Sequence, residues 1–102
     1  MVIYEVNLTL LKNIQAEFEA WLIPHVQQML TFKGFQQAKI LRELFDQEQN
    51  KLTVQYEVDT LDHLQDYFEH HAGAIRAEGV EKFGTQFSAT RRVFNQEQVL
   101  KK

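Results

Sequence analysis

The chain has 102 residues, 44% of them hydrophobic, a formal net charge of -3 and no cysteine. This length predicts one domain over residues 1–102, and the missing cysteine excludes disulfides, thiolate catalysis and cysteine-ligated zinc. Nucleic-acid binders gather positive charge on one face, so we expect no nucleic-acid partner. No apolar stretch approaches the ~20 residues of a membrane helix, and the first residues alternate instead of forming a signal peptide. We therefore expect a cytoplasmic protein without a membrane partner.

Residues 2–11 alternate between apolar and other side chains, which predicts a strand with one apolar face. Asn13 is a suitable N-cap for the helix that follows, whose apolar residues recur at helical spacing. An interior proline removes one backbone hydrogen bond and costs ~3 kcal/mol, so Pro24 predicts a kink or a break near Ile23. The helix is expected to end at residues 33–34, a Lys-Gly pair.

The next segment predicts a hairpin. Residues 35–45 alternate and predict a second strand, and residues 52–58 alternate and predict a third. Between them, the polar sequence DQEQN at residues 46–50 has no apolar side chain to bury. It therefore predicts the hairpin loop.

The last third of the chain predicts a helix and a strand. The Asp-Thr pair at residues 59–60 caps a second helix, which Gly73 and Gly79 weaken, so we expect this helix to break and restart. Residues 85–95 predict a fourth strand, and the polar tail after it is expected to fray.

The predicted element order is βαββαβ. With right-handed crossovers this order gives an α+β fold, the ferredoxin-like plait, in which both helices lie on one face of a four-stranded antiparallel sheet. The other face carries apolar or half-apolar positions on several strands. We therefore predict a homodimer, a dimeric α+β barrel in which two sheets pack face to face.

Several segments that span nearly the whole chain together resemble one family. They are IYEVNLTL, Trp21 with His25 and a nearby proline, GFQQAKILREL, VQYEVDTLDHLQDYFEHHA and IRAEGVEKFGTQFSATRRVF. With these segments the chain resembles the DUF4286 family of the dimeric α+β barrel superfamily. Members tend to place proline two residues after the histidine of the first helix, whereas Pro24 directly precedes His25 here. The resemblance implies the fold and a dimer. The superfamily includes antibiotic-biosynthesis-type and haem-degrading monooxygenases, small-molecule isomerases and ligand-sensing regulatory domains, among which fold alone does not choose.

Two histidines are candidates for chemistry. His71 lies on the apolar stripe of the second helix, where it is either a ligand or general base facing a helix–sheet pocket or a structural core histidine, and we favour the structural role. His25 shares a face with apolar residues of the first helix and could face the same pocket. A metal bound by both would need a third ligand, and no local HxH or HxxxH spacing supplies one. We therefore predict no metal site and no cofactor.

Three arginines are the candidate anion contacts: Arg76, Arg91 and Arg92. Adjacent strand residues point to opposite faces, so one of Arg91 and Arg92 faces the helices. An inward arginine requires a carboxylate or an anionic ligand, and we favour an internal ion pair. The candidate partners are Glu43, Glu57 and Glu78.

Asn7 lies in the middle of the first strand, where asparagine is disfavoured. The haem-degrading monooxygenases of the resembled superfamily use an asparagine on the first strand, a histidine on the second helix and a tryptophan on the third strand. Asn7 and His71 resemble the first two, and Tyr56 is the aromatic that the third strand offers. Trp21, Tyr4 and Tyr67 either line an apolar pocket or fill the core.

The sequence therefore indicates a dimeric α+β barrel protein that binds a small apolar or anionic molecule. The alternative is a small monooxygenase or isomerase that acts in the helix–sheet pocket. The candidate ligand-binding residues are Asn7, His25, Tyr56, His71, Arg76, Arg91 and Arg92.

Overall fold

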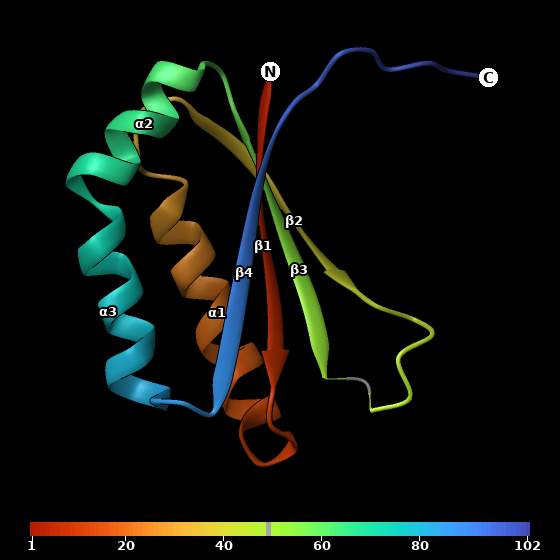
Figure 1. Cartoon of the computed structure of the whole chain (residues 1–102), viewed down its shortest axis with the longest axis vertical. Helices are drawn as coiled ribbons and strands as arrows, with labels where there is room; N and C mark the ends of the chain where they lie inside the picture. Colours follow the sequence, from red (N-terminus) through yellow and green to blue (C-terminus); the bar gives the residue numbers. More distant parts are fainter. Residues whose placement is uncertain (49) are drawn as a thin grey trace.

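The computed structural model describes residues 1–48 and 50–102 (Figure 1). Its elements are β1 (Val2–Leu10), the 3-10 helix η1 (Lys12–Ile14), α1 (Gln15–Met29), β2 (Phe35–Arg42), β3 (Lys51–Val58), α2 (Leu61–His70), α3 (Ala72–Phe83) and β4 (Phe87–Asn95). The strands form one antiparallel sheet in the order β2-β3-β1-β4, and Figure 1 shows all the helices on the same side of it. The predicted ferredoxin-like fold is confirmed.

The alternation of β1 and β3 decides which side chains form the core. Tyr4 pairs with Tyr56 on β3 and with Val93 on β4, and directly paired residues of antiparallel strands point to the same face. The helices complete the core with one buried face each, and each large side chain buried in this way contributes about 1.5–3 kcal/mol. The buried helical residues include Phe18, Leu22, Val26, Met29, Leu64, Tyr67, Ile75 and Phe83.

The first helix differs from the prediction at its start, middle and end. Asn13 lies in η1, and its side chain donates to Gln86 Oε1 at 2.9 Å instead of capping α1. The helix is continuous through Pro24 and does not break near Ile23. Pro24 and Ala20 are both exposed, so water can take the bond that the proline cannot donate to the Ala20 carbonyl. The helix ends at Met29, before the predicted Lys-Gly pair.

The second helical segment breaks, as predicted. Thr60 caps α2 by accepting a hydrogen bond from the backbone N–H of His63 at 3.2 Å. The break is at His71, whose φ of -128° and ψ of -33° separate α2 from α3. It therefore precedes Gly73.

The outer face of the sheet, which is the face opposite the helices, is more polar than the sequence suggested. Glu5 is only 5% exposed there, and its carboxylate accepts hydrogen bonds from Gln55 (3.0 Å), Asn7 (3.1 Å) and Arg92 Nε (2.9 Å). Asn7 in turn accepts from Thr53 Oγ1 at 2.8 Å. The bond from Gln55, with those from Asn7 and Arg92, lowers the pKa of Glu5 although burial opposes this. Polar residues tolerate these mid-strand positions because they satisfy one another.

Two segments extend away from the body of the protein in Figure 1: the β2–β3 connection and the tail after β4. β2 ends at Arg42, so Leu44 and Phe45, which were predicted in the strand, lie in the connection and are 81% and 99% exposed. The predicted loop at residues 46–50 includes Gln49, which lies outside the described residues. No helix in the described part of the chain is long and apolar enough to cross a membrane.

Candidate functional site

A cavity of about 60 Å³ lies between the sheet and the helices. Side chains from α1, α2, α3, β1, β3 and β4 line it, and most of them are apolar or aromatic. The lining residues are Tyr4, Val6, Leu8, Phe18, Trp21, Leu22, His25, Met29, Val54, Tyr56, Tyr67, Ile75, Arg76, Gly79, Phe87 and Arg91.

Three tyrosines form one wall of the cavity. Tyr4 stacks on Tyr56, with ring centroids 5.8 Å apart, and lies 6.0 Å from Tyr67 at a steeper angle. Burial and the neighbouring Tyr4 raise the pKa of Tyr67 to about 12, and burial raises the pKa of Tyr56 still further. Both hydroxyls therefore keep their protons at neutral pH and can donate hydrogen bonds.

His25 lines the same cavity and carries a buried polar atom. Its ring stacks on Trp21 with centroids 4.5 Å apart and an interplanar angle of 21°. Burial lowers the pKa of His25, and the negative charge of Glu78 on α3 opposes this only in part. The ring is therefore neutral at pH 7. Its Nδ1 atom is buried and has no hydrogen-bond partner among the described residues.

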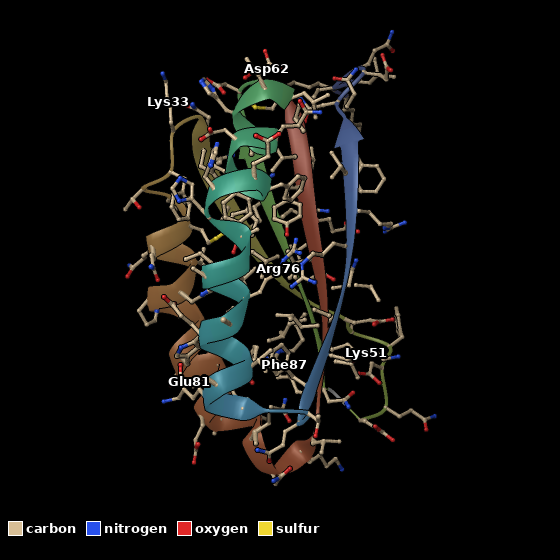
Figure 2. The ribbon with its side chains drawn as sticks, turned by 60° about the vertical axis from the view of Figure 1, so that its left-hand side comes forward. Lys33, Lys51, Asp62, Arg76, Glu81 and Phe87 are labelled. Carbon is tan, nitrogen blue, oxygen red and sulfur yellow. The ribbon has the colours of Figure 1, made fainter. Side chains whose placement is uncertain are left out.

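Arg76 and Arg91 form the mouth of the cavity, because they alone among its lining residues are exposed. Figure 2 shows Arg76 reaching from α3 towards the sheet. Its Nη2 donates a long hydrogen bond to the Tyr4 hydroxyl at 3.4 Å, and its guanidinium lies 6.0 Å from the Phe68 ring centroid. Both positive charges act on Tyr67 and lower its pKa, against the larger effect of burial. In the described part of the chain, neither arginine forms a salt bridge.

Gly79 sets how closely α3 approaches the aromatic end of the cavity. A Cβ atom built on Gly79 would lie 3.3 Å from both Phe87 Cζ and Trp21 Cη2. Figure 2 shows Phe87 between α3 and the start of β4. The sequence suggested only that Gly79 weakens the helix, because nothing local to it reveals the two aromatic rings that approach from other elements.

Four of the seven predicted site residues lie together around the cavity. They are His25, Tyr56, Arg76 and Arg91. They come from α1, β3, α3 and β4, so the fold gathers candidates that are up to 66 residues apart in the chain, counted from His25 to Arg91.

The other three predicted residues lie elsewhere. Asn7 and Arg92 belong to the outer face, where Arg92 Nη2 contacts the Glu5 carboxylate at 2.7 Å. His71 lies at the α2–α3 junction and stacks on Phe32, with centroids 4.5 Å apart, and it does not line the cavity. Asn7 and His71 therefore do not face a common cavity, because β1 turns Asn7 away from the helices.

The expected pairing of the adjacent arginines also needs correction. Alternation does separate them, since Arg91 pairs across from Val6 on the helix side and Arg92 across from Glu5 on the outer face. The outward arginine, and not the inward one, forms the ion pair. Its partner is Glu5, which the sequence did not suggest. The side chain of Arg92 remains 64% exposed, so pairing distinguishes the two arginines more than burial does.

No group of three His, Asp or Glu residues within residues 1–48 and 50–102 is arranged to hold a metal ion. The polar groups that the cavity offers are hydroxyl, imidazole and guanidinium. Such a set can bind an organic molecule with an acidic group, hold it against aromatic walls and accept a proton at His25.

Comparison with known proteins places the chain in a family. The family model described as "Domain of unknown function (DUF4286)" matches residues 1–97. The chain belongs to this family. No curated protein shows significant similarity to the sequence.

Solved structures similar to the family member described here share its fold. One is a Deinococcus radiodurans protein that has been assigned as an antibiotic biosynthesis monooxygenase. It is 14% identical, with 99% of this chain and 97% of that chain covered and a TM-score of 0.78. SnoaB, a cofactor-independent oxygenase from Streptomyces nogalater, is 17% identical over 99% and 98% of the two chains, with a TM-score of 0.75. An ethyl tert-butyl ether d family protein from Bacillus halodurans is 16% identical over 94% and 99%, with a TM-score of 0.67. At these identities the likeness establishes the ferredoxin-like fold of the chain and leaves the chemistry open.

Proposed function

We propose that this protein binds a small, largely apolar molecule with one anionic group in the cavity between its helices and its sheet. The observation that carries the proposal is a pair of arginines, Arg76 and Arg91, at the mouth of an aromatic cavity, neither of which forms a salt bridge with a described carboxylate. Guanidinium groups bind carboxylates with two parallel hydrogen bonds. The aromatic walls would take up the apolar part of the molecule.

A binding assay with simple probes tests this function. Benzoate carries one ring and one negative charge, whereas benzyl alcohol has a similar shape and no charge. We expect calorimetry to show that benzoate binds at least tenfold more tightly. Arg91→Met and Arg76→Met should each weaken benzoate binding about tenfold, the effect of losing a charge-assisted hydrogen bond of about 1.5 kcal/mol.

Arg42→Met is the matched control for both variants. Arg42 lies on β2, does not line the cavity and forms a surface ion pair with Glu19, which contributes at most about 1 kcal/mol to stability. The control removes the same charge from the protein and should leave benzoate binding unchanged. Equal affinity for benzoate and benzyl alcohol, or equal losses in all three variants, would contradict an anion site at the mouth.

We further propose that the protein works as a homodimer, with the outer faces of two sheets packed together. The helices leave the outer face uncovered, and its margins carry Leu41 and Phe94, which are 42% and 40% exposed. Phe45, in the extended β2–β3 connection, is 99% exposed and needs cover. Light scattering after size exclusion should give twice the mass of the chain at micromolar concentration. Phe45→Ser should weaken the dimer, and a wild-type protein that elutes as a monomer would contradict the proposal.

An alternative function is catalysis in the same cavity, as a small monooxygenase or isomerase. The neutral His25, whose Nδ1 atom has no hydrogen-bond partner within residues 1–48 and 50–102, favours it, because such a ring can take a proton from a bound substrate. The similar fold of SnoaB, a cofactor-independent oxygenase, makes oxygenation without a cofactor the first reaction to examine. An oxygen electrode would show uptake with one-ring phenols above the rate without protein, and His25→Phe would abolish it. Uptake that persists in that variant would exclude His25 as the base.

A further inference from the structure

The strongest unexplained feature of the cavity is the Nδ1 atom of His25. It is buried, it lacks a hydrogen-bond partner in the described part of the chain, and its ring lines the same cavity as the two arginines of the mouth. Buried polar atoms are nearly always paired, so an unpaired one on a residue that lines a cavity points to a partner that a water molecule or a ligand supplies.

The tautomer of His25 decides which group that is. The ring is neutral, so one nitrogen carries a hydrogen and the other carries a lone pair. Nδ1 is enclosed. Because the ring as a whole is only half-buried, Nε2 is the nitrogen that can contact water or the Glu78 carboxylate, whose charge acts on the ring. A buried N–H without a partner is rarer in proteins than an acceptor that lacks one, so the hydrogen belongs on Nε2. Nδ1 is then an acceptor and requires a donor from the ligand.

The size of the cavity limits what carries that donor. Its volume of about 60 Å³ is smaller than the about 150 Å³ of an engineered cavity that binds benzene. A whole aromatic ring therefore does not fit inside the cavity. The ligand has at most one ring, and part of that ring and its acidic group must lie in the open mouth. Trp21, Tyr4 and Phe87 offer the flat surfaces against which such a ring packs.

From this arrangement we infer that the ligand is a hydroxylated one-ring aromatic acid. Its carboxylate lies at Arg76 and Arg91, and its hydroxyl group donates to Nδ1 of His25. This inference rests on the proposed binding function and adds to it the second polar group of the ligand. His25 selects for the hydroxyl group, and the arginines supply most of the affinity.

Calorimetry with benzoate, its 3- and 4-hydroxy derivatives and the matching methoxy compounds tests the inference on the full-length protein. One hydroxybenzoate should bind about fivefold more tightly than benzoate, which corresponds to one hydrogen bond of about 1 kcal/mol, and the methoxy analogue should lose this gain because it has no donor. 2-Hydroxybenzoate is an internal control, since its hydroxyl group bonds to its own carboxylate.

Two variants at His25 separate recognition from folding. His25→Phe keeps the ring that packs on Trp21 and removes the acceptor, so it should lose the preference for the hydroxyl group. His25→Asn places an amide oxygen near the position of Nδ1 and should recover part of the preference. In the ¹⁵N spectrum of the free wild-type protein, Nδ1 of His25 should carry no hydrogen.

The outcomes distinguish the two proposals. If benzoate binds through the arginines but hydroxyl groups add nothing, the inference fails and the proposed function stands. A preference that survives in His25→Phe, or a hydrogen on Nδ1, also overturns the inference. If none of the acids binds, both proposals fall together.

Discussion

Replacing Gly79 with alanine tests the packing that shapes the cavity, because two effects of known sign oppose each other at this position. Alanine stabilises a helix interior by about 0.5–1 kcal/mol relative to glycine, and Gly79 lies within α3. The new methyl group would lie 3.3 Å from both Phe87 Cζ and Trp21 Cη2, closer than ordinary van der Waals contact. Neither ring can move freely, since both also contact Phe18, with centroids 5.2 and 5.4 Å from its own.

Overpacking of this kind costs about 1–3 kcal/mol, so we expect Gly79→Ala to lower the free energy of unfolding by up to about 2.5 kcal/mol. Gly73 is the matched control in the same helix. It is exposed, and a Cβ atom there meets no described residue within 4 Å, so Gly73→Ala should stabilise the protein by up to about 1 kcal/mol.

The measurement is urea denaturation of the wild type and both variants at one protomer concentration, since dimerisation makes stability depend on concentration. The cost of overpacking is the difference in unfolding free energy between the two alanine variants, which we expect to be about 1–3 kcal/mol. Such a difference corresponds to a separation in Tm of at least about 4 °C for a chain of this size. If Gly79→Ala stabilises the protein as much as Gly73→Ala does, the two rings yield without cost. The close approach of α3 to Phe87 and Trp21 would then not depend on glycine.

Two further predictions concern stability. Gly34→Ala should lower Tm more than Gly84→Ala does. Both glycines have positive φ, of 89° and 59°, but of the two only Gly34 would place a Cβ atom against another described residue, 2.5 Å from Asp59 Oδ1. Equal losses of Tm in the two variants would show that backbone strain alone decides the effect. The depressed pKa of Glu5 means that its carboxylate adds stability above its ordinary pKa of about 4.3, and that this contribution is lost as pH falls through the lower folded value. Urea midpoints between pH 6 and pH 2.5 should therefore fall more steeply for the wild type than for Glu5→Gln, and parallel curves would refute the assignment.

Local sequence patterns were enough to predict the fold, because a few consecutive residues mark each strand and helix. Period-two alternation marked the strands, and a Thr60 cap started the helix at the residue where the structure begins it. The prediction failed where a local preference met a non-local alternative. Asn13 is a good cap in isolation, but in the folded chain the Gln86 side chain, 73 residues away, accepts its hydrogen bond.

The outer face could not be predicted because alternation assigns residues to faces without aligning the strands. The pairing register places Glu5 directly opposite Gln55 on β3 and Arg92 on β4. A shift of one residue would turn every side chain of a strand to the other face. The Glu5 cluster therefore exists only once three strands are in register, and the sequence shows its members as unrelated polar residues.

The same register decides which of the two adjacent arginines belongs to the site. Arg91 and Arg92 were recognised as a pair that divides between two faces, and the fold assigns one to each. Which of them meets a carboxylate depends on the opposite residue of β1, which is Val6 for Arg91 and Glu5 for Arg92. The site residue is thus the arginine that the register leaves beside an apolar neighbour.

Among the described residues the two arginines at the mouth have no carboxylate partner, and a shortage of acids does not explain this. The protein has 14 Asp and Glu residues against 11 Lys and Arg residues, so carboxylates are in excess. Glu78 is only two residues from Arg76 in α3, a spacing that turns helical side chains to different faces, and its charge acts on His25. An arginine beside an apolar cavity is stabilised by any carboxylate within reach. A single substitution at Val6 on β1, which lies opposite Arg91, would supply such a carboxylate. The described chain instead presents both guanidinium groups without one, which is the arrangement that leaves them available to an anion from outside.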